Sequence, residues 1–155
     1  MKQIIYVSSA APYLTQHDLE AILRRSRAWN TDHDITGVLL KIEDGFFQVL
    51  EGPEVEVDRI FAEIAKDPRH TGVLPLVQRE CTHRQFAAWS MGFKDAAKVT
   101  FPELGGFPLS WSGFTDRLLT PDDTTLITLA HTFFTVNDSR NRFSAPQPAQ
   151  ANLIA

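Results

Sequence analysis

The stretch Gly37–Glu51, with the sequence GVLLKIEDGFFQVLE, decides the fold of this chain of 155 residues. Two apolar runs, Gly37–Ile42 and Phe46–Glu51, flank the sequence Glu-Asp-Gly at 43–45, and an Asp-Gly pair between apolar runs is typical of a β-hairpin. The first run is apolar at successive positions, so both of its faces are expected to be covered. The stretch therefore predicts a hairpin inside a buried sheet.

The chain on either side of this hairpin alternates strands and helices. Upstream, Gln3–Ser9 predicts a buried strand and Thr15–Asn30 predicts a helix. Thr15 and Asp18 have the spacing of a capping box, which marks the start of this helix. Downstream, Pro53–Asp67 predicts a second helix with proline in its first turn.

Two further strands are predicted at Val73–Glu80 and Trp89–Phe93, which gives the order β-α-β-β-α-β-β. This order predicts an α+β fold, a ferredoxin-like sandwich with two helices on one face of a largely antiparallel sheet. The other face needs a cover, because the first hairpin strand is apolar on both sides. We expect C-terminal helical segments there, within Thr120–Val136, with apolar residues at helical spacing: Leu126, Leu129, Ala130, Phe133 and Phe134.

The composition narrows the class of protein. The chain is 22% charged with a net charge of −4, which is unusual for a protein that binds nucleic acid through its phosphates. The single cysteine, Cys81, cannot form an internal disulfide, and no apolar run near the N-terminus is long enough for a membrane span or a signal peptide. The five histidines lack metal-ligand spacing. We therefore expect a cytoplasmic protein with no metal, no nucleic-acid partner and no membrane partner.

The pattern also divides the chain into three parts. Residues 1–94 are dense in periodic pattern and form the expected core. Residues 95–138 are sparser and form a helical cap or output segment. Residues 139–155 are polar and rich in Pro, Gln and Ala, so we expect a disordered tail.

Four polar residues interrupt the apolar pattern. Ser26 and Asn30 continue the core-facing stripe of the first helix, and Tyr6 and Gln48 share strand faces with apolar residues. An unpaired buried polar group costs about 1–3 kcal/mol, so each needs a partner. In a structural interpretation Ser26 bonds a carbonyl one turn back, Asn30 caps the helix, and the strand residues are structural. If both strand residues face the helices, the four converge beneath the groove between the helices and suggest a pocket for a flat, amide-rich ligand.

Basic residues occur at two places near this groove. Arg24, Arg25 and Arg27 are most simply a solvated helix face. Arg69 and His70 follow the end of the second helix and are either plain surface or a site for the phosphates of a ligand.

Six motifs follow one another from Ile4 to about Phe93. They are IIYVSSA with Tyr6, SRAWN with Ser26 and Asn30, DITGVLL with Gly37, FFQVLEGP with Gln48, DPRH with Arg69 and His70, and RQFAAWSMGF with Trp89 and Met91. In this order and at this spacing they resemble the BLUF domains, which are blue-light sensors that use flavin adenine dinucleotide (FAD).

The resemblance implies an isoalloxazine ring between the two helices, with Asn30 on its carbonyl and imide edge and Gln48 between Tyr6 and the N5/O4 edge. In the family the tyrosine passes an electron and then a proton toward the excited ring. The glutamine then rearranges and donates a new hydrogen bond to O4, which gives a small red shift that recovers in the dark. The implied function is a blue-light photoreceptor that binds FAD non-covalently and is not an enzyme.

Other positions follow from the same resemblance. Ser26 lies beside the ring, Ile22 and Ile64 pack on its faces, and Arg69 and His70 meet the ribityl and phosphate portion.

The resemblance also implies a route for the signal. Trp89 and Met91 lie in the segment through which family members transmit the glutamine rearrangement. With Phe93, they are expected on one face of a strand next to the strand at 46–51. Residues 95–155 are too few for a fused effector domain, so we expect signalling through a homo-oligomer or a downstream protein that the sequence does not identify.

Two positions depart from the family pattern. Trp29 stands where many members carry a second asparagine, and Glu63 stands where some carry a basic residue, which puts in doubt how the phosphates are neutralised. Two alternative functions stay open: a small ferredoxin-like hydrolase, although the sequence lacks a phosphate loop, and a flavin- or ligand-binding adaptor that does not respond to light.

Overall fold

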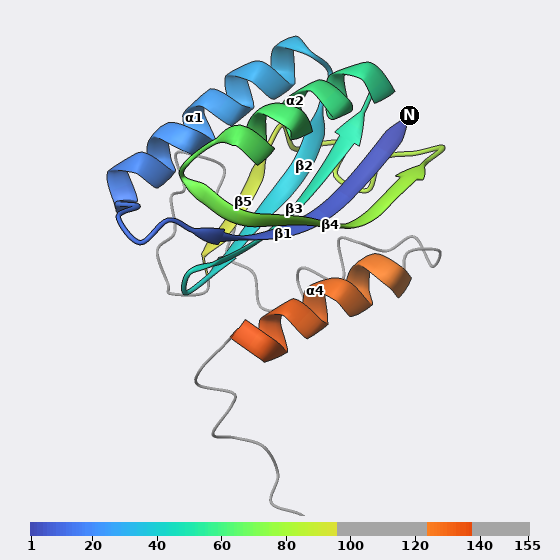
Figure 1. The fold of residues 1–155 in the computed structure, drawn as a ribbon. Coiled ribbons are helices and arrows are strands. Elements are labelled where there is room, and N and C mark those ends of the chain that lie inside the picture. Colours follow the sequence, from blue (N-terminus) through green and yellow to red (C-terminus); the bar gives the residue numbers. More distant parts are fainter. Residues whose placement is uncertain (96–123, 138–155) are drawn as a thin grey trace, which may run out of the picture.

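The computed structural model describes residues 1–95 and 124–137 of the chain (Figure 1). The elements in chain order are β1 (Lys2–Ala10), α1 (Gln16–Asp32), β2 (Thr36–Ile42), β3 (Gly45–Gly52), α2 (Glu54–Lys66), β4 (His70–Glu80), β5 (Gly92–Asp95) and α4 (Thr124–Asn137). The tail expected at 139–155 and residues 96–123 of the expected cap lie outside the described residues.

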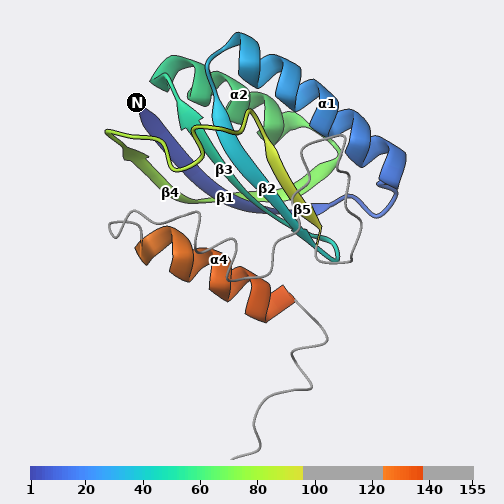
Figure 2. The ribbon, with the colours of Figure 1, turned by 180° about the vertical axis from the view of Figure 1, so that it is seen from behind.

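The five strands form one sheet in the order β4-β1-β3-β2-β5. Neighbouring strands are antiparallel except β2 and β5, which are parallel. Helices α1 and α2 cover one face of the sheet, and α4 lies against the other (Figures 1 and 2). This arrangement confirms the predicted α+β, ferredoxin-like sandwich with helical cover on both faces.

The sheet contributes to an apolar layer on each side. In β2, Leu39 belongs to the layer under α1 and α2, whereas Val38 and Leu40 belong to the layer with α4. The prediction that this strand is covered on both faces is therefore confirmed. The residues of α4 in the second layer are Leu126, Ala130 and Phe133, which are buried, with Leu129 and Phe134 packed partly buried beside them.

Helix α1 begins as the sequence predicts. The N–H of Asp18 donates to Thr15 Oγ1 at 3.2 Å, and the N–H of Thr15 donates to the Asp18 carboxylate at 2.9 Å, so both halves of the capping box form. The helix continues past Asn30 to Asp32. It therefore carries the polar positions of its buried stripe inside the helix, not at its end.

The last strand differs from the prediction in its bounds and its neighbour. β5 spans Gly92–Asp95 and pairs with β2, not with β3. Just upstream the chain turns, because the N–H of Trp89 donates to the carbonyl of Phe86 at 2.9 Å. The carbonyl of Trp89 in turn accepts from the N–H of Gly37 in β2 at 2.9 Å.

This turn separates the indole of Trp89 from the thioether of Met91, which the sequence analysis placed on one face of a strand. Met91 lies with Phe93 in the layer under α1 and α2, whereas Trp89 packs partly buried in the layer with α4. The predicted common face for Trp89, Met91 and Phe93 is wrong. Strand alternation applies only once the strand has begun, and Trp89 precedes it.

Candidate functional site

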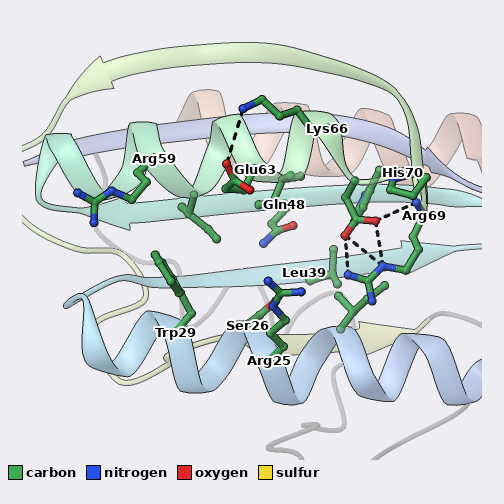
Figure 3. A pocket seen from close by; sticks show the side chains of 15 residues that line it. Arg25, Ser26, Trp29, Leu39, Gln48, Arg59, Glu63, Lys66, Arg69 and His70 are labelled. Carbon is green, nitrogen blue, oxygen red and sulfur yellow. Dashed lines mark hydrogen bonds and ion pairs between the residues drawn. The ribbon is translucent and has the colours of Figure 1, made fainter.

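A cavity of about 690 Å³ opens between α1 and α2 over the sheet (Figure 3). Ile22 of α1 and Ile60 and Ile64 of α2 contribute apolar walls, and Leu39 and Gln48 line it from the sheet. This volume lies within the range of about 300–1,000 Å³ that is typical of small-molecule pockets. A space between two helices with isoleucines on both sides suits a planar ligand.

The pairing of β1 with β3 places Tyr6 directly opposite Gln48. The Tyr6 hydroxyl, which has no exposed surface, donates a hydrogen bond to Gln48 Oε1. The amide nitrogen of Gln48 donates to Met91 Sδ at 3.6 Å, and the Gln48 side chain extends from β3 into the cavity (Figure 3). The predicted convergence of Tyr6 and Gln48 on the helix face is therefore confirmed.

The phenol of Tyr6 is held in its protonated form. Burial raises the pKa of the Tyr6 hydroxyl, and the negative charge of Asp67 raises it further. The ring edge of Phe61 packs against the Tyr6 ring, with 5.3 Å between ring centroids. Tyr6 is thus a fixed, neutral hydrogen-bond donor one side chain away from the cavity.

The two polar residues of α1 have different surroundings. Ser26 lines the cavity. Asn30 is 1% exposed, does not line the cavity, and donates its amide N–H to the carbonyl of Ser90 at 2.5 Å. The interpretation of Asn30 as a helix cap is wrong, because the C-cap residue of α1 is His33, whose N–H donates to the carbonyl of Trp29.

Arg69 and His70 both line one end of the cavity. The Arg69 guanidinium holds the Asp67 carboxylate with both ends, at 2.9 Å from Nε to Oδ1 and 2.5 Å from Nη2 to Oδ2. This pairing lowers the pKa of Asp67, so the carboxylate stays charged. Burial lowers the pKa of His70, whose Nδ1 lies 3.1 Å from Ser8 Oγ, so the imidazole is neutral at pH 7.

Three further cationic side chains line the cavity (Figure 3). Arg59 lies 3.2 Å from the Glu56 carboxylate, and Lys66 lies 3.7 Å from that of Glu63. Within the described part of the chain, Arg25 has no carboxylate at ion-pair distance. The charge of Glu63 is thus offset by its neighbour in α2, and among the described residues no carboxylate compensates the positive charge of Arg25 in the cavity wall.

Of the three arginines of α1 that the sequence suggested as a solvated face, Arg24 and Arg25 are exposed, whereas Arg27 is partly buried. Arg24 is exposed and lies 3.7 Å from Glu20. Arg25 lines the cavity. Arg27 is partly buried, and its Nε donates to the carbonyl of Met91 at 3.0 Å, so this residue ties α1 to the segment before β5.

Seven residues of the cavity were not assigned to the site from the sequence: Arg25, Leu39, Arg59, Ile60, Lys66, Asp67 and Pro68. Signals for two of them were present in the sequence. Leu39 occupies the hairpin position opposite Gln48, and Ile60 lies one helical turn before Ile64. Trp29, noted as a departure, also lines the cavity, and its ring stacks on His33 with centroids 3.8 Å apart.

Other kinds of site are not found in the part of the chain that the structure describes. Residues 1–95 and 124–137 contain no group of three or more metal-binding side chains. No helix among them has the length and apolar character needed to cross a membrane.

Solved structures resemble this chain over most of its length. "BlrB - a BLUF protein, dark state structure" matches with a TM-score of 0.61 and 31% identity, over 76% of this chain and 90% of that one. Klebsiella pneumoniae BlrP1 with FMN and cyclic diGMP matches with a TM-score of 0.71 and 29% identity, over 95% of this chain and 37% of that one.

The curated relatives are much longer proteins, and this chain matches less than a fifth of the length of each of the two described here. The photoactivated adenylate cyclase subunit beta of Euglena gracilis is 33% identical over 103 residues, which are 65% of this chain and 12% of the relative. The blue light- and temperature-regulated antirepressor BluF of Escherichia coli is 35% identical over 77 residues, 50% of this chain and 19% of the relative. The model of the family described as sensors of blue-light using FAD matches residues 1–92. The chain therefore belongs to the BLUF family of blue-light sensors.

Proposed function

We propose that this chain is a blue-light photoreceptor that binds FAD non-covalently in the cavity between α1 and α2. The observation that carries the proposal is the hydrogen bond from Tyr6 to Gln48, because Gln48 itself lines the cavity. Ile22 and Ile64 would hold the isoalloxazine ring between the helices, and Ser26 would contact it from the side. The cavity suits such a ligand, since apolar side chains of both helices line it and its lining carries four cationic side chains against two carboxylates.

Asn30 is proposed to meet the carbonyl and imide edge of the ring. Its bond to Ser90 uses one of the two amide hydrogens, so a second N–H and the carbonyl oxygen remain for a ligand. Arg69 and His70 are proposed to meet the ribityl and phosphate portion. Because Arg69 is already paired with Asp67, it brings little net charge to a phosphate.

The photochemistry depends on Tyr6 and Gln48. A bound flavin supplies absorption of blue light and an excited state that takes up an electron. Tyr6 would give up an electron to the excited flavin, and its hydroxyl proton would leave toward the ring along the hydrogen bond to Gln48. The amide of Gln48 has a donor at one end and an acceptor at the other, so rotation or tautomerisation exchanges the two ends without creating a charge. After the electron and proton return to Tyr6, the rearranged amide remains until the dark arrangement is restored.

Isolation of the protein tests the proposal. The purified protein should be yellow and should release FAD on denaturation, because no residue is proposed to attach the flavin covalently. A colourless protein that takes up no added FAD would contradict the proposal. The alternatives to test would then be a small ferredoxin-like hydrolase and an adaptor that binds another ligand and does not respond to light.

The charge pattern of the cavity predicts how substitution of Arg25 changes the affinity for flavins. Arg25→Gln should weaken binding of FAD and FMN roughly tenfold, because a hydrogen bond to a charged group contributes about 1.5–3 kcal/mol. Binding of riboflavin, which has no phosphate, should be unchanged. Titration of the apoprotein with each flavin measures these affinities.

The neighbouring Arg24 provides the control for Arg25. It is exposed, lies against Glu20 and does not line the cavity, so Arg24→Gln should bind all three flavins normally. Equal losses of riboflavin and FAD affinity in Arg25→Gln would show that this arginine does not act on the phosphate.

The output is proposed to pass from the cavity to a protein interface, without a catalytic step in this chain. Met91 contacts Gln48 on the cavity face. Trp89 stacks on Phe86 in the layer with α4, with ring centroids 5.7 Å apart. A rearrangement of Gln48 that moves Met91 also moves Trp89 and the docking of α4. The readout is a homo-oligomer or a downstream protein, in the cytoplasm.

Trp89→Ala separates the photochemistry from this output. The red shift should be retained, because Trp89 packs in the layer with α4, on the side of the sheet away from Tyr6 and Gln48. Light-induced change in amide exchange of α4 should be lost, because the aromatic contact beneath the helix is gone. Exchange measured in darkness and under illumination checks both expectations. Light-induced changes confined to the cavity residues in the unsubstituted protein would show that the signal leaves by another route.

A further inference from the structure

Glu51 is a buried carboxylate that the photochemistry of Tyr6 and Gln48 does not use. It lies on β3 and has no exposed surface. Because alternate residues of a strand face opposite sides, Gln48 faces the cavity while Glu51 lies on the same side as Phe47 and Val49, in the layer with α4. A buried charge is costly unless it is paired and hydrogen-bonded. The hydrogen-bond partners of the Glu51 carboxylate therefore indicate its role.

The carboxylate accepts three hydrogen bonds. Oε1 accepts from the Gln3 side-chain amide at 2.7 Å and from the backbone N–H of Gln85 at 3.1 Å. Oε2 accepts from the backbone N–H of Phe86 at 3.1 Å. Arg79 Nε donates to the carbonyl oxygen of the Gln3 side chain at 2.8 Å, which orients the Gln3 amide with its N–H toward Glu51. Two strands are thereby joined to the connection between β4 and β5.

The β4–β5 connection, residues 81–91, is also held at its other end. Asn30 donates to the carbonyl of Ser90 at 2.5 Å, and Arg27 donates to the carbonyl of Met91 at 3.0 Å. The connection therefore runs from the α4 side of the sheet, where the carboxylate binds it, to the cavity side, where α1 binds it. It therefore has contacts in both layers.

We propose that Glu51 is the positioning residue of this connection: it fixes the backbone at Gln85 and Phe86 and thereby sets how Met91 contacts Gln48. This inference rests on the proposed function only in treating Gln48 as the switch. The anchoring itself is a property of the protein without light. A carboxylate suits the role because both of its oxygens accept, whereas an amide accepts with one end only.

The protonation state of Glu51 is set by opposing causes. Burial raises the pKa of Glu51, and the hydrogen bonds from Gln3, Phe86 and Gln85 work against this, together with the positive charge of Arg84. Arg84 itself is paired with Asp34 at 2.7 Å. The three donors around the carboxylate all favour its ionised form, in which both oxygens accept hydrogen bonds.

The test is Glu51→Gln, which changes one oxygen to an NH₂ group. An NH₂ group in the place of Oε2 would face the backbone N–H of Phe86. An NH₂ group in the place of Oε1 would face the backbone N–H of Gln85. In either orientation one backbone donor loses its acceptor. Amide exchange in darkness at the residue that loses its acceptor, Gln85 or Phe86, should become roughly 10- to 100-fold faster, the range given by leaving a buried donor unpaired. Glu80→Gln, at an exposed glutamate of β4, should change neither amide.

The light response gives a second readout that a merely structural role would not change. Glu51→Gln should keep the red shift, since Tyr6 and Gln48 are intact. Its dark recovery should be roughly three- to tenfold faster, because a loosened Met91 restrains the Gln48 amide less and lowers the barrier to its return. Unchanged recovery together with unchanged exchange at Gln85 and Phe86 would overturn the proposal.

Two further results complete the test. If Glu51→Gln does not fold, Gln3→Leu removes one donor to the carboxylate while keeping both backbone bonds. It should accelerate exchange at Gln85 and Phe86 by a smaller factor, and no acceleration would overturn the anchoring. If the unsubstituted protein shows no reversible shift, the proposed function fails, and the exchange at these two amides still decides the role of Glu51.

Discussion

Tyr6→Phe should give a yellow protein that shows no reversible red shift under blue light. The substitution keeps the aromatic ring and its packing against Phe61, so the cavity and its flavin should be retained. It removes the hydroxyl that donates to Gln48, and with it the proposed source of the electron and the proton. The unpaired Gln48 oxygen should also lower the free energy of unfolding by about 1 kcal/mol. Absorption spectra before and after illumination measure the shift.

Tyr13→Phe is the matched control for Tyr6→Phe. The Tyr13 side chain is 66% exposed, and its hydroxyl donates to the carbonyl of Pro68 at 3.0 Å, away from Gln48. The same loss of a hydroxyl there should leave the shift intact. A full, reversible shift in Tyr6→Phe would mean that another group starts the rearrangement.

Gln48→Leu should also abolish the shift while the protein keeps its flavin. Leucine has a similar size and preserves the apolar packing of β3 in the cavity wall, but it has neither a donor nor an acceptor to exchange. The Tyr6 hydroxyl would then be buried without its present acceptor, and Met91 would lose its contact with the amide. The absorption maximum of the illuminated protein should therefore equal that of the dark protein.

Gln78→Leu provides the comparison for Gln48→Leu. Gln78 is an exposed residue of β4, so its loss should leave both flavin binding and the shift unchanged. Should Gln48→Leu retain the normal shift, the hydrogen-bond switch would have to be assigned to another residue of the cavity.

Those parts of the site that depend on local pattern could be predicted from the sequence. Alternation along the strands grouped Tyr6 with Ile4 and Gln48 with Phe46 and Leu50. The resemblance to the family placed the two polar residues together, and the antiparallel pairing of β1 and β3 puts them opposite each other. The spacing of Thr15 and Asp18 predicted the start of α1. These features depend on residues close in sequence or on one strand period, so a single sequence carries them.

The rest of the site depends on contacts between distant segments. Met91 and Trp89 lie in different layers because the chain turns at Phe86, and that turn is stabilised by Glu51 and Gly37. Asn30 is bound by Ser90, far along the chain, and not by the end of its own helix. A local sequence period cannot indicate such pairings between distant segments. The last strand was therefore predicted to begin at Trp89, three residues before its observed start at Gly92.

The spectrum of the purified protein in darkness and under blue light tests the central claim most directly. The account predicts a flavin absorption band that moves slightly to longer wavelength on illumination and returns in the dark, because Gln48 rearranges while the flavin is chemically unchanged. A flavin band that does not move, or one that bleaches and requires an added oxidant to recover, would contradict it.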